Sequence, residues 1–306
     1  MKEGQPKTVL LKDYQVPKYL IDETSLHFDI SSAYTVVTAE LTIRRNFEAS
    51  TSNTELVLDG SEMTTRNIWI DGQVLHPSRY AITKTSLTIF DVPGSFVLKT
   101  QVEIKPQDNT ALEGLYKSGD MYCTQCEAQG FRNITWYLDR PDVLSKFRTT
   151  ILADKGHFPV LLSNGNEVDR GKDGLRHWVT WEDPYKKPAY LFALVAGDLK
   201  YIEDTFTTMS GRLVTLQIFT EEHNIDKLDF AMRSLQKAMS WDEETYGREY
   251  DLDIFMIVAV DTFNMGAMEN KGLNVFNTSC VLTRPCLLYT SPSPRDLSTS
   301  RMPSSA

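Results

Sequence analysis

Short stretches of alternating apolar and polar residues run from residue 25 to residue 196. Alternation at this period is typical of β-strands that have one buried face. Asp-Gly and Pro-Gly pairs at 59–60, 71–72 and 93–94 predict turns between the strands. Many short strands with regular turns favour an all-β sandwich. The predicted strands are 26–30, 34–47, 56–58, 68–70, 87–90, 96–98, 102–104, 147–154, 160–162, 177–181 and 190–196.

The pattern changes in a second region that begins near Asp204. A strand is predicted over residues 213–219, and Asn224 is the expected N-cap of a following helix. Apolar residues then recur at helical spacing until Gly247, so we predict an amphipathic helix that ends there. Its apolar positions are Ile225, Leu228, Met232, Leu235 and Met239.

The segment from residue 251 to residue 277 follows this helix. An apolar run, Ile254–Val260, lies between two aspartates and predicts a buried strand. A second strand is predicted around Leu273 and Val275, and the segment that leads into it starts with Gly266, three residues before Glu269. Glycine in a strand marks a bulge or the close approach of another backbone. On pattern alone, the residues between the strands are a tight connection with Glu269 in solvent.

The connection contains a motif that gives it a second interpretation. Residues 266–270 read Gly-Ala-Met-Glu-Asn, the GAMEN exopeptidase motif. Further matching segments occur in family order at 109–116, 123–132, 137–142, 161–166 and 191–198. From about Lys7 to Arg284, the chain resembles the bacterial type of the aminopeptidase N family of zinc metallopeptidases.

The resemblance implies a mainly β chain of two domains. It places an N-terminal, saddle-like β-sandwich at residues 1–198 and the β-rich start of a thermolysin-like α+β catalytic domain at 199–284. Residues 285–306 are rich in Ser, Pro and Thr, have no apolar periodicity and do not resemble the family. We expect this tail to be disordered and not native to the fold.

The zinc site of such an enzyme is not found in the sequence. The family binds zinc through HExxH and a later glutamate, but none of the five histidines here has another within five residues. The general-base glutamate and the oxyanion tyrosine are missing with that motif, so we assign no catalytic or metal-binding residue. Cys123 and Cys126 have the spacing of half a zinc ribbon or a redox pair, and without a second half we assign them no metal. Zinc is expected only in the complete enzyme.

Substrate-binding residues are assigned by the resemblance. A peptide's free N-terminus is an ammonium, and Glu269 and Glu127, with Gln125 beside the latter, are the expected groups that bind it. Two converging carboxylates repel each other, and an incoming ammonium relieves that repulsion. Small side chains at Gly266 and Ala267 would let a peptide pair with the strand edge. Met265 either cushions the first side chain of the substrate or packs in the core. The motif adds Met268 and Asn270.

Composition limits the partners. A net charge of −9 disfavours nucleic-acid and anionic-membrane surfaces. The polar first residues and the four unevenly spaced cysteines indicate a cytoplasmic protein, which we expect to be a monomer acting on peptides with a free N-terminus. The alternative is a non-catalytic scaffold or binding protein derived from the same family. We expect the chain itself to be inactive, and we expect residues 254–260 to lack covering helices and to promote aggregation.

Overall fold

The computed structural model describes residues 10–49 and 54–283 of the chain. Within them, strands predominate and there are two α-helices, α1 (Asp229–Tyr246) and the single turn α2 (Thr278–Val281). Six short 3₁₀-helices connect other elements: η1 (Leu11–Asp13), η2 (Pro77–Arg79), η3 (Pro106–Asp108), η4 (Phe131–Asn133), η5 (Ala189–Leu191) and η6 (Glu222–Lys227). No helix in the described ranges is long and apolar enough to cross a membrane.

The chain divides into two compact units that are interleaved in sequence. The described residues of unit 1 lie within 1–116, 124–154 and 167–192, and those of unit 2 within 117–123, 155–166 and 193–306. The boundary predicted near residue 198 divides the sequence only once. In the structure the chain passes between the units several times, so each unit is built from separate segments.

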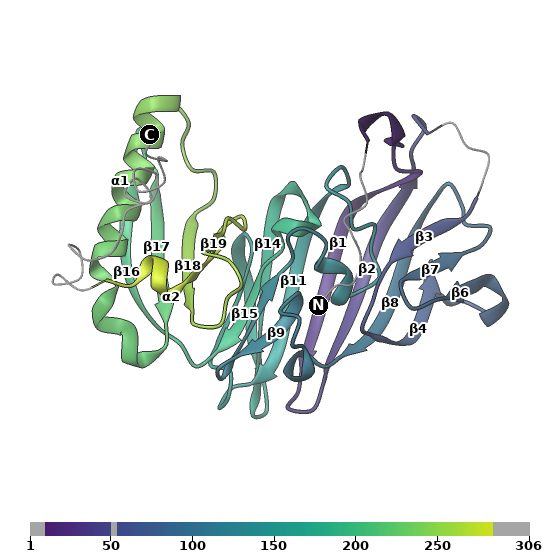
Figure 1. Cartoon of the computed structure of the whole chain (residues 1–306), viewed down its shortest axis with the longest axis horizontal. Helices are drawn as coiled ribbons and strands as arrows, with labels where there is room; N and C mark the ends of the chain where they lie inside the picture. Colours follow the sequence, from purple (N-terminus) through teal and green to yellow (C-terminus); the bar gives the residue numbers. More distant parts are fainter. Residues whose placement is uncertain (1–9, 50–53, 284–306) are drawn as a thin grey trace, which may run out of the picture. The chain divides into compact units, whose positions relative to one another are not determined.

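Unit 1 contains the largest sheet, which is mostly antiparallel (Figure 1). β1 and β11 are a parallel pair within it, and the pairs β1–β2, β11–β14, β2–β8, β4–β8 and β4–β5 are antiparallel. In spatial order its strands are β13 (Asn166–Asp173), β14 (Arg176–Pro188), β11 (Leu144–Asp154), β1 (Tyr19–Ile30), β2 (Thr35–Arg45), β8 (Ser95–Ile104), β4 (Thr64–Ile70) and β5 (Gln73–Val74). A three-stranded sheet in the same unit has the order β3 (Leu56–Asp59), β7 (Ser86–Ile89) and β6 (Tyr80–Ile82).

Aromatic side chains form the centre of unit 1. Phe131 makes edge contacts with Tyr137, Phe147 and Phe192, with ring centroids 4.7, 6.0 and 5.3 Å away. Phe28 stacks on Phe192 at 6.0 Å. All five are buried, and buried aromatic pairs stabilise a core beyond the area that they remove from water.

Two smaller sheets complete the fold. A four-stranded sheet has the order β12 (Val160–Ser163), β15 (Leu194–Gly197), β10 (Met121–Gln125) and β9 (Gly114–Ser118). A five-stranded sheet in unit 2 has the order β16 (Lys200–Thr207), β17 (Leu213–Thr220), β18 (Ile254–Val260), β20 (Leu273–Asn277) and β19 (Ala267–Met268).

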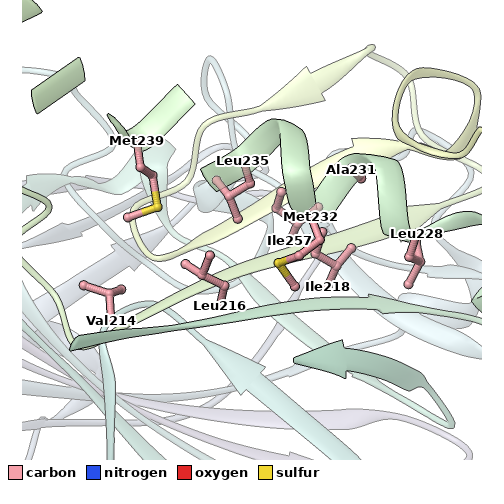
Figure 2. Close-up of a cluster of buried hydrophobic side chains, with 9 residues drawn as sticks. All are labelled: Val214, Leu216, Ile218, Leu228, Ala231, Met232, Leu235, Met239 and Ile257. Atoms are coloured by element: carbon pink, nitrogen blue, oxygen red, sulfur yellow. The ribbon is translucent and has the colours of Figure 1, made fainter. Parts of the chain in front are cut away.

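Helix α1 covers one face of the five-stranded sheet (Figure 2). Its apolar side packs on alternate residues of β17 and on β18, as the amphipathic pattern predicts. The buried cluster consists of Val214, Leu216, Ile218, Leu228, Ala231, Met232, Leu235, Met239 and Ile257.

The predicted strands are confirmed for most of unit 1, with differences in extent. The segments 96–98 and 102–104 are one strand, β8, because Thr100 is buried between them and preserves the alternation. The predicted segment 190–196 begins instead with η5 and becomes β15 only at Leu194. The strands β5, β6, β9, β10, β13 and β16 were not predicted from the sequence. At 71–72, Asp71 and Gly72 both have positive φ in a two-residue hairpin loop between β4 and β5.

Two predictions in unit 2 were wrong. Asn224 does not cap the long helix, which starts at Asp229 after η6. Its side chain instead bonds His223 and Lys227 and is buried, so it cannot cap a helix N-terminus. The strand Ile254–Val260 is also better covered than expected, because the residues from Met256 onward are buried. The predicted end of the helix at Gly247, in the left-handed conformation, is confirmed.

Asp142 is hydrogen-bonded to Tyr14, near the N-terminal end of the described residues, and its titration tests whether this contact forms in solution. Its carboxylate accepts hydrogen bonds from Arg140 at 2.8 and 2.7 Å and from the Tyr14 hydroxyl at 2.8 Å. These donors hold the pKa of Asp142 below its usual value, the Arg140 bond contributing most. A carboxylate with a lowered pKa stabilises the folded state above its unfolded pKa, and that stability is lost as pH falls.

We therefore expect Asp142→Asn to flatten the acid limb of the stability curve. The unmodified chain should lose more free energy of unfolding than the variant between about pH 5 and pH 3. Urea unfolding at each pH measures the free energy of unfolding of both proteins. Asp173→Asn, at an exposed position on β13, is the control and should follow the unmodified chain. Parallel curves of stability against pH for Asp142→Asn and the unmodified chain would contradict a stabilising role of the Asp142 carboxylate.

Candidate functional site

The motif at 266–270 lies on the edge of the five-stranded sheet. β18 and β20 are parallel neighbours, and the residues between them return as β19, antiparallel to β20. Asn277, at the end of β20, holds this connection at two points: its backbone N–H donates to the Gly266 carbonyl at 2.9 Å, and its side-chain amide donates to the Phe263 carbonyl at 3.2 Å. β19 is therefore a fixed edge strand whose outer side is not paired within its sheet.

The motif residues differ in exposure. Gly266, Ala267 and Glu269 are exposed, and Met265 is 41% exposed. Met268 is fully buried, and Asn270 is 1% exposed with its side-chain amide 3.5 Å from the Met268 carbonyl. The structure thus presents Met265, Gly266, Ala267 and Glu269 to solvent, and it uses the side chains of Met268 and Asn270 inside the unit.

Gly272 fixes where β20 begins. Its φ of +78° favours glycine, and an added Cβ would lie 2.9 Å from Cδ1 of Leu252 and 3.1 Å from the backbone nitrogen of Gly165. The close approach of another backbone was predicted for Gly266, where an added Cβ would meet only Cys280 Sγ at 3.4 Å; the structure shows that approach at Gly272 instead. The start of β20 sets the register in which Ala267 pairs with Phe276 and Met268 with Val275.

We expect Gly272→Ala to destabilise the chain more than Gly211→Ala does. Both glycines have positive φ, +78° and +87°, so both variants have a conformational cost of about 1–2 kcal/mol. Nothing lies within 4 Å of an added Cβ at Gly211, whereas Gly272 also has the clash, which adds about 1–3 kcal/mol. Urea denaturation followed by tryptophan fluorescence measures both, and equal losses would mean that the contact with Gly165 relaxes freely.

The other predicted residues, Gln125 and Glu127, lie in unit 1 at the end of β10. Gln125 is buried and its side-chain amide donates to the Glu127 carbonyl at 3.3 Å, while the Glu127 side chain is exposed. The turn closes through a hydrogen bond from the Gly130 N–H to the Cys126 carbonyl at 2.8 Å. A Cβ at Gly130 would lie 2.4 Å from the Gln125 carbonyl oxygen, so only glycine allows this tight turn.

The structure therefore arranges the predicted residues in two sets. Gln125 and Glu127 are together on one turn in unit 1, and residues 265–270 are together on the sheet edge in unit 2. Two supporting residues were not identified from sequence. Asn277 anchors the motif, and the Ser118 hydroxyl accepts a hydrogen bond from the Thr262 N–H at 3.1 Å. Neither has a sequence signal, because each acts through a backbone that only the fold brings near it.

The residues present do not fit a catalytic zinc. Within the described parts of the chain, the residues grouped closely enough to hold a metal are Glu221, His223 and Asp261, whose ligand atoms lie within 4.8 Å of one another. This group has one histidine and no HExxH helix, so it is not the zinc site of a metallopeptidase. Three of the four cysteines are described, and none of these three is in a disulfide: Cys123 and Cys126 are buried and Cys280 is exposed.

Two segments of the chain match known peptidase families. Residues 14–191 match the peptidase M1 N-terminal domain, and residues 230–295 match the peptidase family M1 domain. The second match ends inside the segment that we set apart as a tail, which lies outside the described residues.

Individual relatives give the same result. The chain is 52% identical to aminopeptidase N of Caulobacter vibrioides over 93% of its own length and 33% of that protein, and 51% identical to aminopeptidase N of Escherichia coli over 92% and 32%. The crystal structure of Legionella pneumophila aminopeptidase A in complex with aspartic acid superposes with a TM-score of 0.87 at 35% identity, covering 90% of this chain and 32% of that one. The chain thus spans about a third of the length of these relatives.

Proposed function

Because this chain belongs to the peptidase M1 family, we propose that it carries the amine-recognition part of a metalloaminopeptidase, an enzyme that removes N-terminal amino acids from peptides. The observation that carries the proposal is the position of the GAMEN motif, on an edge strand with Glu269 exposed directly after it. The substrates are peptides with a free N-terminus.

The edge strand suggests how a peptide is held. An extended peptide can add to the outer side of β19 by main-chain hydrogen bonds, with the small residues Gly266 and Ala267 allowing close approach. Its ammonium then reaches Glu269, and Glu127 is the second carboxylate proposed to bind it. Met265 lies just before this edge and is proposed to contact the first side chain. An internal peptide segment has no ammonium and leaves the carboxylates without a counter-charge, which favours exopeptidase selectivity.

Hydrolysis is a property that we propose only for a longer protein of this family. The family's zinc ligands do not occur in this sequence, so no step of peptide-bond cleavage is assigned to the described residues. What these residues supply is binding and orientation of the peptide's N-terminus.

Binding of a free amine tests the proposal. We expect alanyl-alanine amide to bind the chain at pH 6.5 and its N-acetyl derivative not to bind, measured by isothermal titration calorimetry. Affinity should fall as pH rises through about 8, where the α-amine loses its proton. Glu269→Gln and Glu127→Gln should each weaken binding about tenfold, since each removes a charge-assisted hydrogen bond.

Glu222→Gln is the matched control. Glu222 is an exposed glutamate of unit 2 outside the motif, and its replacement should leave affinity unchanged. Equal binding of the acetylated and free peptides, or equal losses in all three variants, would refute the proposed amine site.

We also propose that the protein is a cytoplasmic monomer that binds neither nucleic acid nor membranes. Cys123, Cys126 and Cys280 are in no disulfide, which fits a reducing compartment, and the net charge of −9 disfavours anionic partners. Size-exclusion chromatography with light scattering tests the oligomeric state.

A further inference from the structure

A pocket of about 390 Å³ lies at the C-terminal end of α1, within unit 2. Its apolar wall comes from Met239 and Tyr246 on α1 and from Tyr250 and Phe255 after it. Met239 is the last residue of α1 in the buried cluster, and it is drawn at one end of the cluster in Figure 2. The volume is within the range of pockets that hold small ligands or single side chains.

A buried carboxylate, Glu243, stands in the wall of this pocket. The residue is 9% exposed, and its Oε2 accepts a hydrogen bond from the Met209 N–H at 2.9 Å. Its Oε1 is buried, and no group in the described part of the chain donates to it. A buried acceptor without a donor is costly, so a ligand that brings N–H groups to Glu243 would be stabilised.

The other charges of the pocket are mostly negative. Asp242, Glu243 and Glu249 give three carboxylates and Arg248 gives one cation, so the pocket has a net charge of 1 − 3 = −2. Glu249 accepts hydrogen bonds from the Ser210 N–H at 2.8 Å and hydroxyl at 2.7 Å, and these lower its pKa, the bond from the hydroxyl contributing most. Glu249 is therefore ionised at neutral pH. A cation is the expected ligand.

Aromatic rings in the same wall restrict the kind of cation. The Tyr250 and Phe255 rings have centroids 5.1 Å apart at 52°, and Tyr246 is exposed on the rim. A guanidinium is planar, more weakly hydrated than an ammonium, stacks on aromatic faces and donates two parallel hydrogen bonds to a carboxylate. Met239 offers an apolar surface for the methylene groups behind it.

We infer that this pocket binds the guanidinium group of an arginine side chain presented by a polypeptide. Glu243 is the anchor, Asp242 adds charge at the rim, and the aromatic rings receive the flat face of the guanidinium. The pocket shares no residue with the motif at 265–270, and a ligand for it needs no free α-amine.

Titration with Nα-acetyl-arginine amide tests the inference, because its blocked amine is not a ligand for the proposed amine site. Calorimetry on the 306-residue chain should show binding. The citrulline analogue, of the same shape but neutral, should bind at least about tenfold more weakly, and the lysine analogue should also be weaker. Equal affinity for the arginine and citrulline compounds would overturn the inference, and equal affinity for arginine and lysine would overturn the assignment to guanidinium.

Variants separate a ligand site from a structural role of Glu243. Glu243→Gln keeps an acceptor for the Met209 N–H but removes the charge, and it should weaken binding about tenfold. Glu244→Gln removes the same charge from the next residue of α1, which does not line the pocket, and should bind as the unmodified chain does. Tyr246→Leu, at a position that is 64% exposed, should weaken binding about threefold. A folded Glu243→Gln with unchanged affinity would show that Glu243 only anchors the turn at Met209. If Glu243→Gln does not fold, unchanged affinity of Tyr246→Leu would overturn the inference.

Discussion

Lys187→Met is expected to lower the free energy of unfolding by about 3–5 kcal/mol. The Lys187 ammonium lies 3.0 Å from the Asp183 carboxylate, and the two side chains are only 2% and 0% exposed. The ammonium also lies 3.9 Å from the centre of the Phe147 ring. Removing the lysine leaves the Asp183 charge buried with its counter-charge gone, and that desolvated charge is the main cost.

The double variant Asp183→Leu/Lys187→Met should recover much of this loss, because an apolar pair leaves no buried charge. Lys186→Met is a matched control at the adjacent residue. The Lys186 ammonium contacts the Asp22 carboxylate at 2.6 Å in an ion pair whose side chains are 44% and 30% exposed, so its loss should cost about 0–1 kcal/mol. Urea unfolding gives all three values, and equal effects of the Lys186 and Lys187 variants would contradict the importance of burial.

The second large effect concerns catalysis. The 306-residue chain is expected to hydrolyse alanine p-nitroanilide no faster than buffer, because the sequence contains no HExxH. Enzymes accelerate such reactions by at least about a millionfold, so even slight catalysis would be measurable. Atomic absorption of the purified chain should show well below one tightly bound zinc ion per chain. Peptidase activity together with stoichiometric zinc would contradict the prediction.

The gene sequence distinguishes a peptidase from a scaffold protein of the same family. A reading frame that continues past codon 284 into HExxH favours the enzyme, and unrelated sequence or a stop favours the scaffold. A longer chain that includes HExxH should be active, and its Glu269→Gln variant should lose more activity toward free-amine peptides than its Glu222→Gln variant does.

The sequence by itself determined the local structure and the family. Alternation predicted most strands of unit 1, because a strand with one buried face must alternate, and helical spacing predicted α1 and its end at Gly247. The GAMEN motif, through the family resemblance, led to the prediction that residues 265–270 bind substrate, and that role remains a proposal. The predicted N-cap at Asn224 failed because that side chain has better partners in His223 and Lys227, and both contacts depend on how η6 folds.

Only the tertiary structure determined the order of the strands and which polar and apolar side chains are buried. Hydrogen bonding between strands made β18 and β20 parallel neighbours and left β19 at the edge, an order that no residue pattern specifies. Packing then buried Met268 and Asn270 while Glu269, between them, stayed exposed. The buried Lys187–Asp183 pair and the unpaired oxygen of Glu243 were also invisible in the sequence. Alternation records which side of a strand avoids water, whereas strand order and the partners of buried charges depend on segments far apart in the chain.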